Sequence, residues 1–300
     1  METARSATVP PASGARNGGA VQRGTVTTRD GIELPLYRWP ARTPLRATVA
    51  LLHGLAEHAG RYAALADRLS AVGIELVAID LRGHGEAPGK RAYVRRFSDY
   101  LLDAQALLDE AATSCASLFL MGHSMGGAVA ALYAIEQLPA TSRRLSGLIL
   151  SSPALAPGRD VPRWMLKLSQ IISRLWPTFP AMKIDASLLS RLQPVVNANR
   201  QDPLVHHGAI PARTGAELLL AMARIERGRT GLRVPLLIYH GTADKLTEPE
   251  GSRAFGTHAG SPDKTLTLHE NSYHETMNDL DRDKVIGELI AWIEARVPRG

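Results

Sequence analysis

The pattern of apolar and polar residues changes character after about residue 40. Before that point, two strand-like runs at 25–28 and 32–39 flank Asp30-Gly31, a dipeptide that favours a tight hairpin turn. After it, short and nearly continuous apolar runs alternate with longer segments whose apolar residues recur every three to four positions. Such runs are typical of parallel strands buried on both faces, and such segments are typical of the helices that cover them. The pattern therefore predicts a doubly wound α/β fold: a mostly parallel sheet with an antiparallel hairpin at its N-terminal end.

The same pattern places the individual elements. Strands are expected at 48–53, 74–81, 118–121, 148–151, 236–240 and 265–269. Helices are expected at 62–72, 97–112, 125–137, 252–258 and 284–297.

Two stretches do not follow the alternation. Residues 1–24 are rich in Gly, Ala, Pro, Ser and Arg without an apolar period, which predicts a disordered tail. Residues 152–233 show helical patterns and prolines but no convincing strand, which predicts a helical cap inserted above the strand ends. The predicted core then consists of 25–151 and 234–300.

One helical stripe within the predicted cap is strongly apolar. It consists of Trp164, Met165, Leu168, Ile171, Ile172, Leu175 and Trp176. Two interpretations remain open: the stripe packs on its own domain, or part of it lines an apolar pocket or meets lipid.

Composition limits the class of protein. Three hundred residues with 45% hydrophobic content suit one large domain with an insertion. No apolar run reaches the roughly 18 to 20 residues of a membrane span, and no secretory signal core is recognisable, so we expect a cytoplasmic protein. The lone Cys115 excludes an internal disulfide framework and is expected to be a free, packed thiol.

Charge and motifs argue against several kinds of partner. The net charge of +6 is diffuse, and no dense basic run is interleaved with aromatic residues, so we expect no nucleic-acid binding. The pairs His206-His207 and His53 with His58 lack the companions and spacing of a zinc site. There is no phosphate-binding loop and no dinucleotide fingerprint, so we expect chemistry that uses neither a cofactor nor a metal.

The sequence Gly122-His123-Ser124-Met125-Gly126-Gly127 lies between an expected strand and an expected helix. A Gly-x-Ser-x-Gly motif in this setting makes a sharp turn that exposes the serine hydroxyl, and its glycines leave room for the crossing chain. The following helix directs free amide hydrogens at the same point. Ser124 is therefore the candidate nucleophile.

A serine nucleophile needs a base, and the base needs an acid partner. In one common arrangement the acid and then the histidine follow the serine along the chain. Asp244 follows an expected strand between the two, with Asp263, in a turn on the opposite edge, as the fallback. Of the histidines after Asp244, His274 lies in the loop between the last strand and the last helix, at the carboxyl edge where such sheets place their sites.

Two other histidines compete with His274. His258 falls in a helical pattern and His269 at the end of a strand, so both fit the role less well.

The negative oxygen of an acyl-transfer intermediate needs two backbone donors. One should be the amide of Met125, directly after the serine. The other should be the amide of Leu55, because His53-Gly54-Leu55 follows the strand at 48–53.

Together these motifs resemble the monoacylglycerol lipase and lysophospholipase group of serine α/β-hydrolases, from about residue 24 to residue 297. The resemblance rests on His53-Gly54-Leu55-Ala56-Glu57-His58, Gly60-Arg61-Tyr62, Asp80-Leu81-Arg82-Gly83-His84-Gly85, Gly122-His123-Ser124-Met125-Gly126-Gly127, Asp202-Pro203-Leu204, Gly241-Thr242-Ala243-Asp244 and Tyr273-His274-Glu275.

The resemblance implies an α/β-hydrolase fold with Ser124 as nucleophile, Asp244 and His274 as its relay, and Leu55 and Met125 as oxyanion donors. It also implies that 152–233 form a mobile cap over an acyl-chain pocket. Asp202-Pro203-Leu204 looks like a family motif near the return of the cap to the sheet, or else is a local turn.

We therefore predict a serine carboxylic ester hydrolase that cleaves monoacylglycerols to fatty acid and glycerol through an acyl-serine. A short-chain carboxylesterase, a lysophospholipase and a non-catalytic lipid-binding module are the alternatives. The expected partner is a lipid-like ester. Peripheral contact of the cap with a membrane and the oligomeric state are left open.

Overall fold

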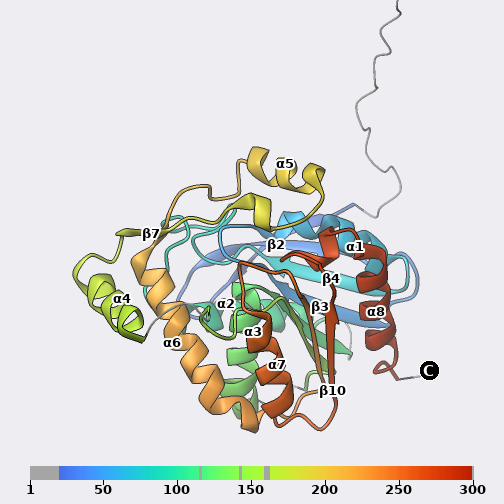
Figure 1. The fold of residues 1–300 in the computed structure, drawn as a ribbon. Coiled ribbons are helices and arrows are strands. Elements are labelled where there is room, and N and C mark those ends of the chain that lie inside the picture. The colour runs from blue at the N-terminus through green and yellow to red at the C-terminus, as the bar shows by residue number, and fades with distance from the viewer. Residues whose placement is uncertain (1–19, 115–116, 142–143, 159–162, 299–300) are drawn as a thin grey trace, which may run out of the picture.

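Helices cover both faces of a central sheet in the computed structural model, which describes residues 20–298 apart from 115–116, 142–143 and 159–162 (Figure 1). The eight-stranded sheet has the order β1-β2-β4-β3-β5-β6-β9-β10. Its strands are β1 (Gln22–Thr27), β2 (Glu33–Trp39), β3 (Ala47–Leu52), β4 (Ile74–Ile79), β5 (Leu118–His123), β6 (Gly147–Ser151), β9 (Leu236–Gly241) and β10 (Lys264–His269). Strand β2 runs antiparallel to β1 and β4, and the other neighbours are parallel. The predicted fold class is confirmed.

The predicted hairpin forms β1 and β2. Gly31 has a φ of +83°, which glycine adopts without steric cost, and the amide of Ile32 donates to Oγ1 of Thr28 at 2.9 Å. Strand β1 begins at Gln22, so the expectation of disorder over 1–24 is wrong for 22–24. Most of β1 is exposed at the sheet edge, so it lacks the buried apolar alternation that marks a strand in sequence. Residues 1–19 lie outside the described residues.

The two faces of the sheet carry different helices. Helices α1 (Ala63–Ser70) and α8 (Arg282–Glu294) bury their apolar residues against one face. Helices α2 (Asp99–Ala111), α3 (Met125–Glu136) and α7 (Pro249–His258) cover the other.

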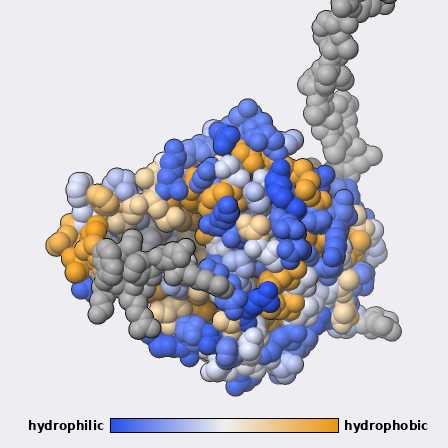
Figure 2. Space-filling view, viewed as in Figure 1, coloured by the Kyte–Doolittle hydropathy of each residue, from blue (hydrophilic) through white to orange (hydrophobic). Residues whose placement is uncertain are grey.

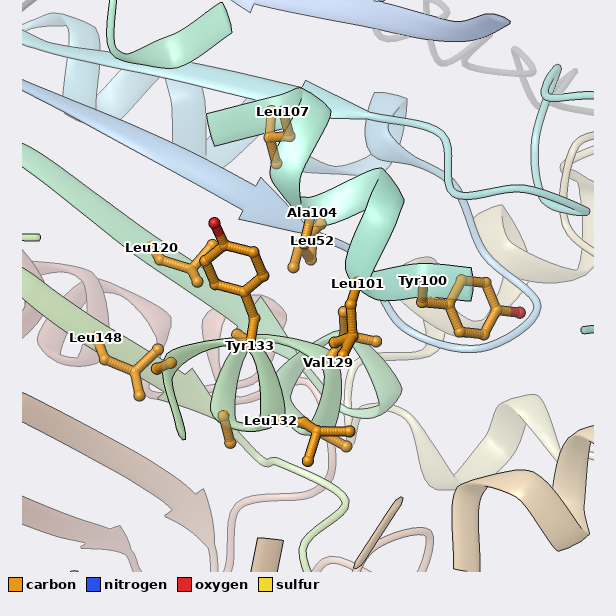
Figure 3. Packing of buried hydrophobic residues seen from close by; sticks show 14 of the residues in the cluster. Leu52, Tyr100, Leu101, Ala104, Leu107, Leu120, Val129, Leu132, Tyr133 and Leu148 are labelled. Carbon is orange, nitrogen blue, oxygen red and sulfur yellow. The ribbon is translucent and has the colours of Figure 1, made fainter. Parts of the chain in front are cut away.

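Each inner strand contributes side chains to two hydrophobic clusters, one on each face of the sheet. In β3, Leu51 belongs to the cluster under α1 and α8, whereas Leu52 belongs to the cluster under α2 and α3, because successive side chains point to opposite faces. Figure 3 shows Leu101 of α2 and Val129 of α3 packed with Leu52 between the helices and the strands. Full burial of a leucine side chain stabilises the fold by roughly 1.5–3 kcal/mol. This is why the inner strands appear in the sequence as continuous apolar runs.

The predicted cap region contains α4 (Arg163–Leu175), β7 (Pro180–Met182), α5 (Gln193–Gln201), β8 (Ile210–Pro211) and α6 (Ala212–Gly228). The expectation that it holds no strand is wrong, because β7 and β8 form a small antiparallel sheet. Pro180 and Pro211 lack an amide hydrogen for the ladder, which keeps this pairing short and obscures it in the sequence.

Helix α6 belongs partly to the core. It packs on α3, and its Ala221, Met222 and Ile225 join the same hydrophobic cluster as that helix. It also packs against α4, which lies at the left end of the molecule in Figure 1. The boundaries of the cap at 152 and 233 remain a prediction.

None of the helices in the described ranges is long and apolar enough to cross a membrane. The expected thiol, Cys115, lies outside the described residues.

Candidate functional site

Ser124 is the single residue between β5 and α3. Its backbone has φ 53° and ψ −118°, a strained conformation that costs about 1–3 kcal/mol for a residue other than glycine. A Cβ at Gly122 would lie 2.2 Å from the carbonyl oxygen of Gly126, and a Cβ at Gly126 would lie 2.2 Å from that of Leu52. Only glycine fits at either position. The turn therefore holds Ser124 in a strained and only partly buried position, as the motif predicts.

Asp244 and His274 meet at the carboxyl edge of the sheet. Each lies in the loop after its strand, β9 or β10, and Nδ1 of His274 is 2.7 Å from Oδ2 of Asp244. The loops touch because Gly241 has no side chain: a Cβ there would lie 2.2 Å from the carbonyl oxygen of Ser272.

Opposite charges shift both pKa values of this pair. Burial by itself raises the pKa of Asp244, but the charge of His274 and hydrogen bonds from His240 and His274 outweigh it, so the pKa is well below its usual value. For His274, burial lowers the pKa while the charge of Asp244 raises it, and the net shift is upward.

The competing residues lie elsewhere. Asp263 precedes β10 at the opposite edge, where it forms an ion pair with Arg296 at 2.6 Å. His258 lies in α7 and contacts the carbonyl of Ala254 at 2.8 Å. His269 ends β10, and none of the three is among the residues that line the cavity above Ser124.

A second histidine, which sequence reasoning missed as a site residue, contacts the same carboxylate. Nε2 of His240 lies 3.0 Å from Oδ2 of Asp244, and Oγ1 of Thr247 donates to that oxygen at 2.8 Å. Nδ1 of His240 is 2.7 Å from Oγ of Ser252. The available signal was the position of His240 four residues before Asp244, across the turn at Gly241.

The loop after β3, which contains the predicted oxyanion donor Leu55, is held by buried side chains. The amide of Leu81 donates to Nε2 of His53 at 2.9 Å, so Nδ1 carries the proton and donates to the carbonyl of Gly54 at 2.8 Å. Burial lowers the pKa of His53, in keeping with a neutral ring. Oε1 of Glu57 accepts from the amide of Gly54 at 2.6 Å. Both peptide bonds that flank Gly54 are thus anchored just before Leu55.

Arg61 joins this loop to the loop of His274. It contacts Oε2 of Glu57 at 2.6 Å and both carboxylate oxygens of Glu275 at 2.7 and 3.0 Å. Burial by itself raises the pKa of Glu57, but the charges of Arg61 and His123 lower it to about 2. Sequence reasoning noted these residues only as family motifs and did not predict that they meet.

A cavity of about 1250 Å³ opens above Ser124. Its lining includes the five predicted site residues Leu55, Ser124, Met125, Asp244 and His274. The predicted cap contributes an apolar part with Leu168, Ile172, Ile184, Leu218, Leu219 and Met222. Met125 is the first residue of α3, so no carbonyl of its own helix accepts from its amide.

The apolar stripe of the predicted cap divides between two environments. Leu168 and Ile172 of α4 line the cavity, although Leu168 is also 43% exposed, whereas Ile171, Leu175 and Trp176 are 54%, 82% and 60% exposed and do not line it. The side chains of Trp164 and Met165 lie outside the described residues. Among the residues that the structure describes, no three His, Cys, Asp or Glu side chains are grouped to hold a metal ion.

Residues 43–281 match the family model described as "Serine aminopeptidase, S33". The chain is 34% identical over 265 residues to the monoacylglycerol lipase of Mycolicibacterium smegmatis, covering 88% of this chain and 93% of the relative. It is 33% identical to the monoglyceride lipase of Homo sapiens over 273 residues, covering 89% of this chain and 88% of the human protein. The crystal structure of Paleococcus ferrophilus monoacylglycerol lipase is similar with a TM-score of 0.77 and 33% identity, covering 87% of this chain and 99% of that one.

Proposed function

Because the chain belongs to the monoacylglycerol lipase family of serine α/β-hydrolases, as its motifs predicted, we propose that it hydrolyses monoacylglycerols to fatty acid and glycerol. The observation that carries the proposal is the large, partly apolar cavity with Ser124, His274 and Asp244 in its lining. A fatty-acyl chain needs such a space, and its ester needs such a group of side chains.

The proposed reaction begins with proton transfer from Ser124 to His274. Nδ1 of His274 donates to Asp244, which leaves Nε2 as the nitrogen that accepts the serine proton. The serine oxygen attacks the ester carbonyl carbon, and the amides of Leu55 and Met125 donate to the resulting negative oxygen. Each such donor contributes on the order of 10² to 10³ in turnover.

The acyl-serine forms as glycerol leaves with the proton held by His274. Water then attacks the acyl carbon with His274 as base, and the fatty acid is released. The anchored Gly54 peptides support this mechanism because they hold the loop of Leu55 in place before substrate binds.

The apolar part of the cavity favours a long acyl chain over a short one. Each methylene transferred from water to an apolar wall contributes roughly 0.8 kcal/mol, about fourfold in affinity. Hydrolysis rates for monoacylglycerols should therefore rise from two to twelve carbons. A flat profile would favour the short-chain carboxylesterase, and faster cleavage of lysophospholipids would favour the lysophospholipase.

Ser124→Ala tests the nucleophile. Removal of the hydroxyl should abolish nearly all hydrolysis and all labelling by a fluorophosphonate, whereas the wild type is labelled at Ser124. Substantial turnover by the variant would reject the mechanism, and absence of labelling in the wild type would favour a non-catalytic lipid-binding module. The family description names a peptidase activity. Hydrolysis of an aminoacyl anilide, measured beside that of the monoacylglycerol, tests for it.

The exposed residues of α4 and the segment after it support peripheral contact with a membrane. Ile171, Leu175, Trp176 and Met182 are more than half exposed, and hydrophobic side chains gather at this end of the molecule (Figure 2). A patch of this kind next to a lipid cavity suits a lipid surface.

Leu175→Ser and Trp176→Ser should reduce cosedimentation with neutral phosphatidylcholine vesicles. Leu280→Ser is the matched control, because Leu280 is 59% exposed and lies outside the predicted cap. If the Leu175 and Trp176 variants bind vesicles as strongly as Leu280→Ser and the wild type do, the proposed membrane contact is rejected.

A further inference from the structure

Two imidazole rings contact one oxygen of the carboxylate of Asp244. The mechanism above uses His274 and leaves His240 without a role. Building on the proposed function, we propose that His240 is a positioning residue that holds the carboxylate of Asp244 in place for its hydrogen bond with His274.

The hydrogen-bond partners determine the tautomer of His240. Carboxylate Oδ2 of Asp244 only accepts, so Nε2 of His240, 3.0 Å away, carries a proton. For a neutral ring Nδ1 is then an acceptor, and the hydroxyl of Ser252 donates to it at 2.7 Å. The chain of donors therefore runs from Ser252 in α7 through His240 to Asp244.

This chain is shielded from water. The side chains of His240 and Asp244, which contact each other, are both fully buried, and Ser252 is 0% exposed. Hydrogen bonds in such a setting are stronger than in water, and a lost donor leaves an uncompensated part of the buried charge.

The other contacts of Asp244 show what His240 adds. Oδ1 accepts from the backbone amides of Leu246 and Thr247 at 2.8 and 3.1 Å. Oδ2 accepts from His274, from Oγ1 of Thr247 and from His240. Of these donors, His240 belongs to strand β9, and its ring is also held by Ser252 of helix α7. It therefore ties the carboxylate to the rigid core and not only to its own loop.

A purely structural role of His240 would lead to different activities of its variants. If His240 only filled space at the end of β9, an apolar residue of similar size would preserve the reaction. If it supplies the donor, Leu should impair the reaction, while Gln, which keeps an N–H donor, should restore most of it.

The pH profile gives a second readout. The groups that face His274 are Asp244, Glu275 and Glu57, together with the ring of His123 at 4.7 Å between centroids. Those that face Asp244 are His274 and His240. Loss of the His240 donor leaves more of the carboxylate charge for His274, which stabilises the imidazolium. The acid limb of kcat/KM should then move to higher pH.

The experiment compares wild type, His240→Leu, His240→Gln and Ser252→Ala. Steady-state kinetics on p-nitrophenyl butyrate and the rate of fluorophosphonate labelling are measured from pH 5 to 9, with a thermal melt for each variant. His240→Leu should lower kcat about 10- to 100-fold, with KM within about twofold. His240→Gln should recover kcat to within about threefold of wild type, and Ser252→Ala should fall between Leu and Gln.

The proposal is overturned if His240→Leu keeps wild-type kcat and acid limb, or if His240→Gln is as slow as His240→Leu. Should His240→Leu not fold, His240→Gln and Ser252→Ala decide: wild-type kcat and acid limb in Ser252→Ala would overturn the proposal. The labelling rate requires an activated serine but no glycerol ester. A wild type that labels at Ser124 yet does not cleave monoacylglycerol would therefore refute the proposed function and leave the test of His240 intact.

Discussion

Asp202 of the predicted cap binds His58 of the core, with Oδ2 of Asp202 3.0 Å from Nε2 of His58. The amide of Gly60 donates to Nδ1 of His58 at 3.2 Å, so the ring proton is on Nε2. A neutral ring can therefore donate this hydrogen bond to Asp202. Close by, the amide of His206 donates to the carbonyl of Ala56 at 2.8 Å. Asp202-Pro203-Leu204 is thus more than a local turn, because it joins the predicted cap to the loop after β3.

Loss of this contact should loosen the cap region. Asp202→Ala should lower the free energy of unfolding by about 1 kcal/mol, because one partly buried hydrogen bond is lost. Melting by differential scanning calorimetry measures the effect. His58→Ala and the double variant complete a double-mutant cycle. A coupling energy near zero would contradict a direct link between the two residues.

The turn at Ser124 should not tolerate a side chain at Gly126. In Gly126→Ala the new Cβ would lie 2.2 Å from the carbonyl oxygen of Leu52, so β3 or α3 must shift, and we expect loss of folding or of all hydrolysis. Gly287→Ala in α8 is the matched control, because the added Cβ would meet no other part of the protein within 4 Å beyond its own stretch of helix. It should gain about 1 kcal/mol in stability from helix propensity. An active Gly126→Ala variant with an unchanged melting temperature would contradict the claim that a Cβ at this position has no room.

Removal of the Arg61 charge should strongly destabilise the fold. Arg61→Leu leaves Glu57 and Glu275 buried without their cation, which should cost about 3–5 kcal/mol of unfolding free energy. Arg68→Ala is the control, because its ion pair with Asp283 is exposed and should contribute less than about 1 kcal/mol. Urea denaturation compares the two. Equal losses in both variants would contradict the buried network.

The activity should fall on the acid side with a midpoint above pH 6.5. His274 accepts the serine proton only when it is neutral, and although burial lowers its pKa, the charge of Asp244 raises it above the ordinary value. A raised pKa keeps the ring protonated to higher pH, so kcat/KM increases through that pH. A pH profile on a soluble ester checks this, and a midpoint below 6.5 would refute it. In Asp244→Asn the midpoint should move downward and the rate should fall sharply, since the charge is gone.

Local sequence determined most of the fold. The apolar run of β5 and the glycines around Ser124 specify a strand, a turn and a helix among adjacent residues, and the Asp30-Gly31 turn does the same for β1 and β2. Weak local patterns were missed. The start of β1 at Gln22 was not predicted because its first residues are exposed at an edge, and β7 and β8 are too short to show a period.

The candidate site divides in the same way. Ser124, Asp244 and His274 could be found because each follows a strand, and the ends of parallel strands meet at one edge. Other contacts depend on how separate loops pack over that edge, namely the ion pair of Arg61 with Glu275 and the link of His58 to Asp202. Residues 214 positions apart, such as Arg61 and Glu275, become neighbours through the whole sheet and not through any pattern around either one. The candidate reactive groups could thus be predicted from local sequence, whereas the side chains that hold them could be seen only in the folded protein, because a buried charge acquires its partners only when the chain has packed.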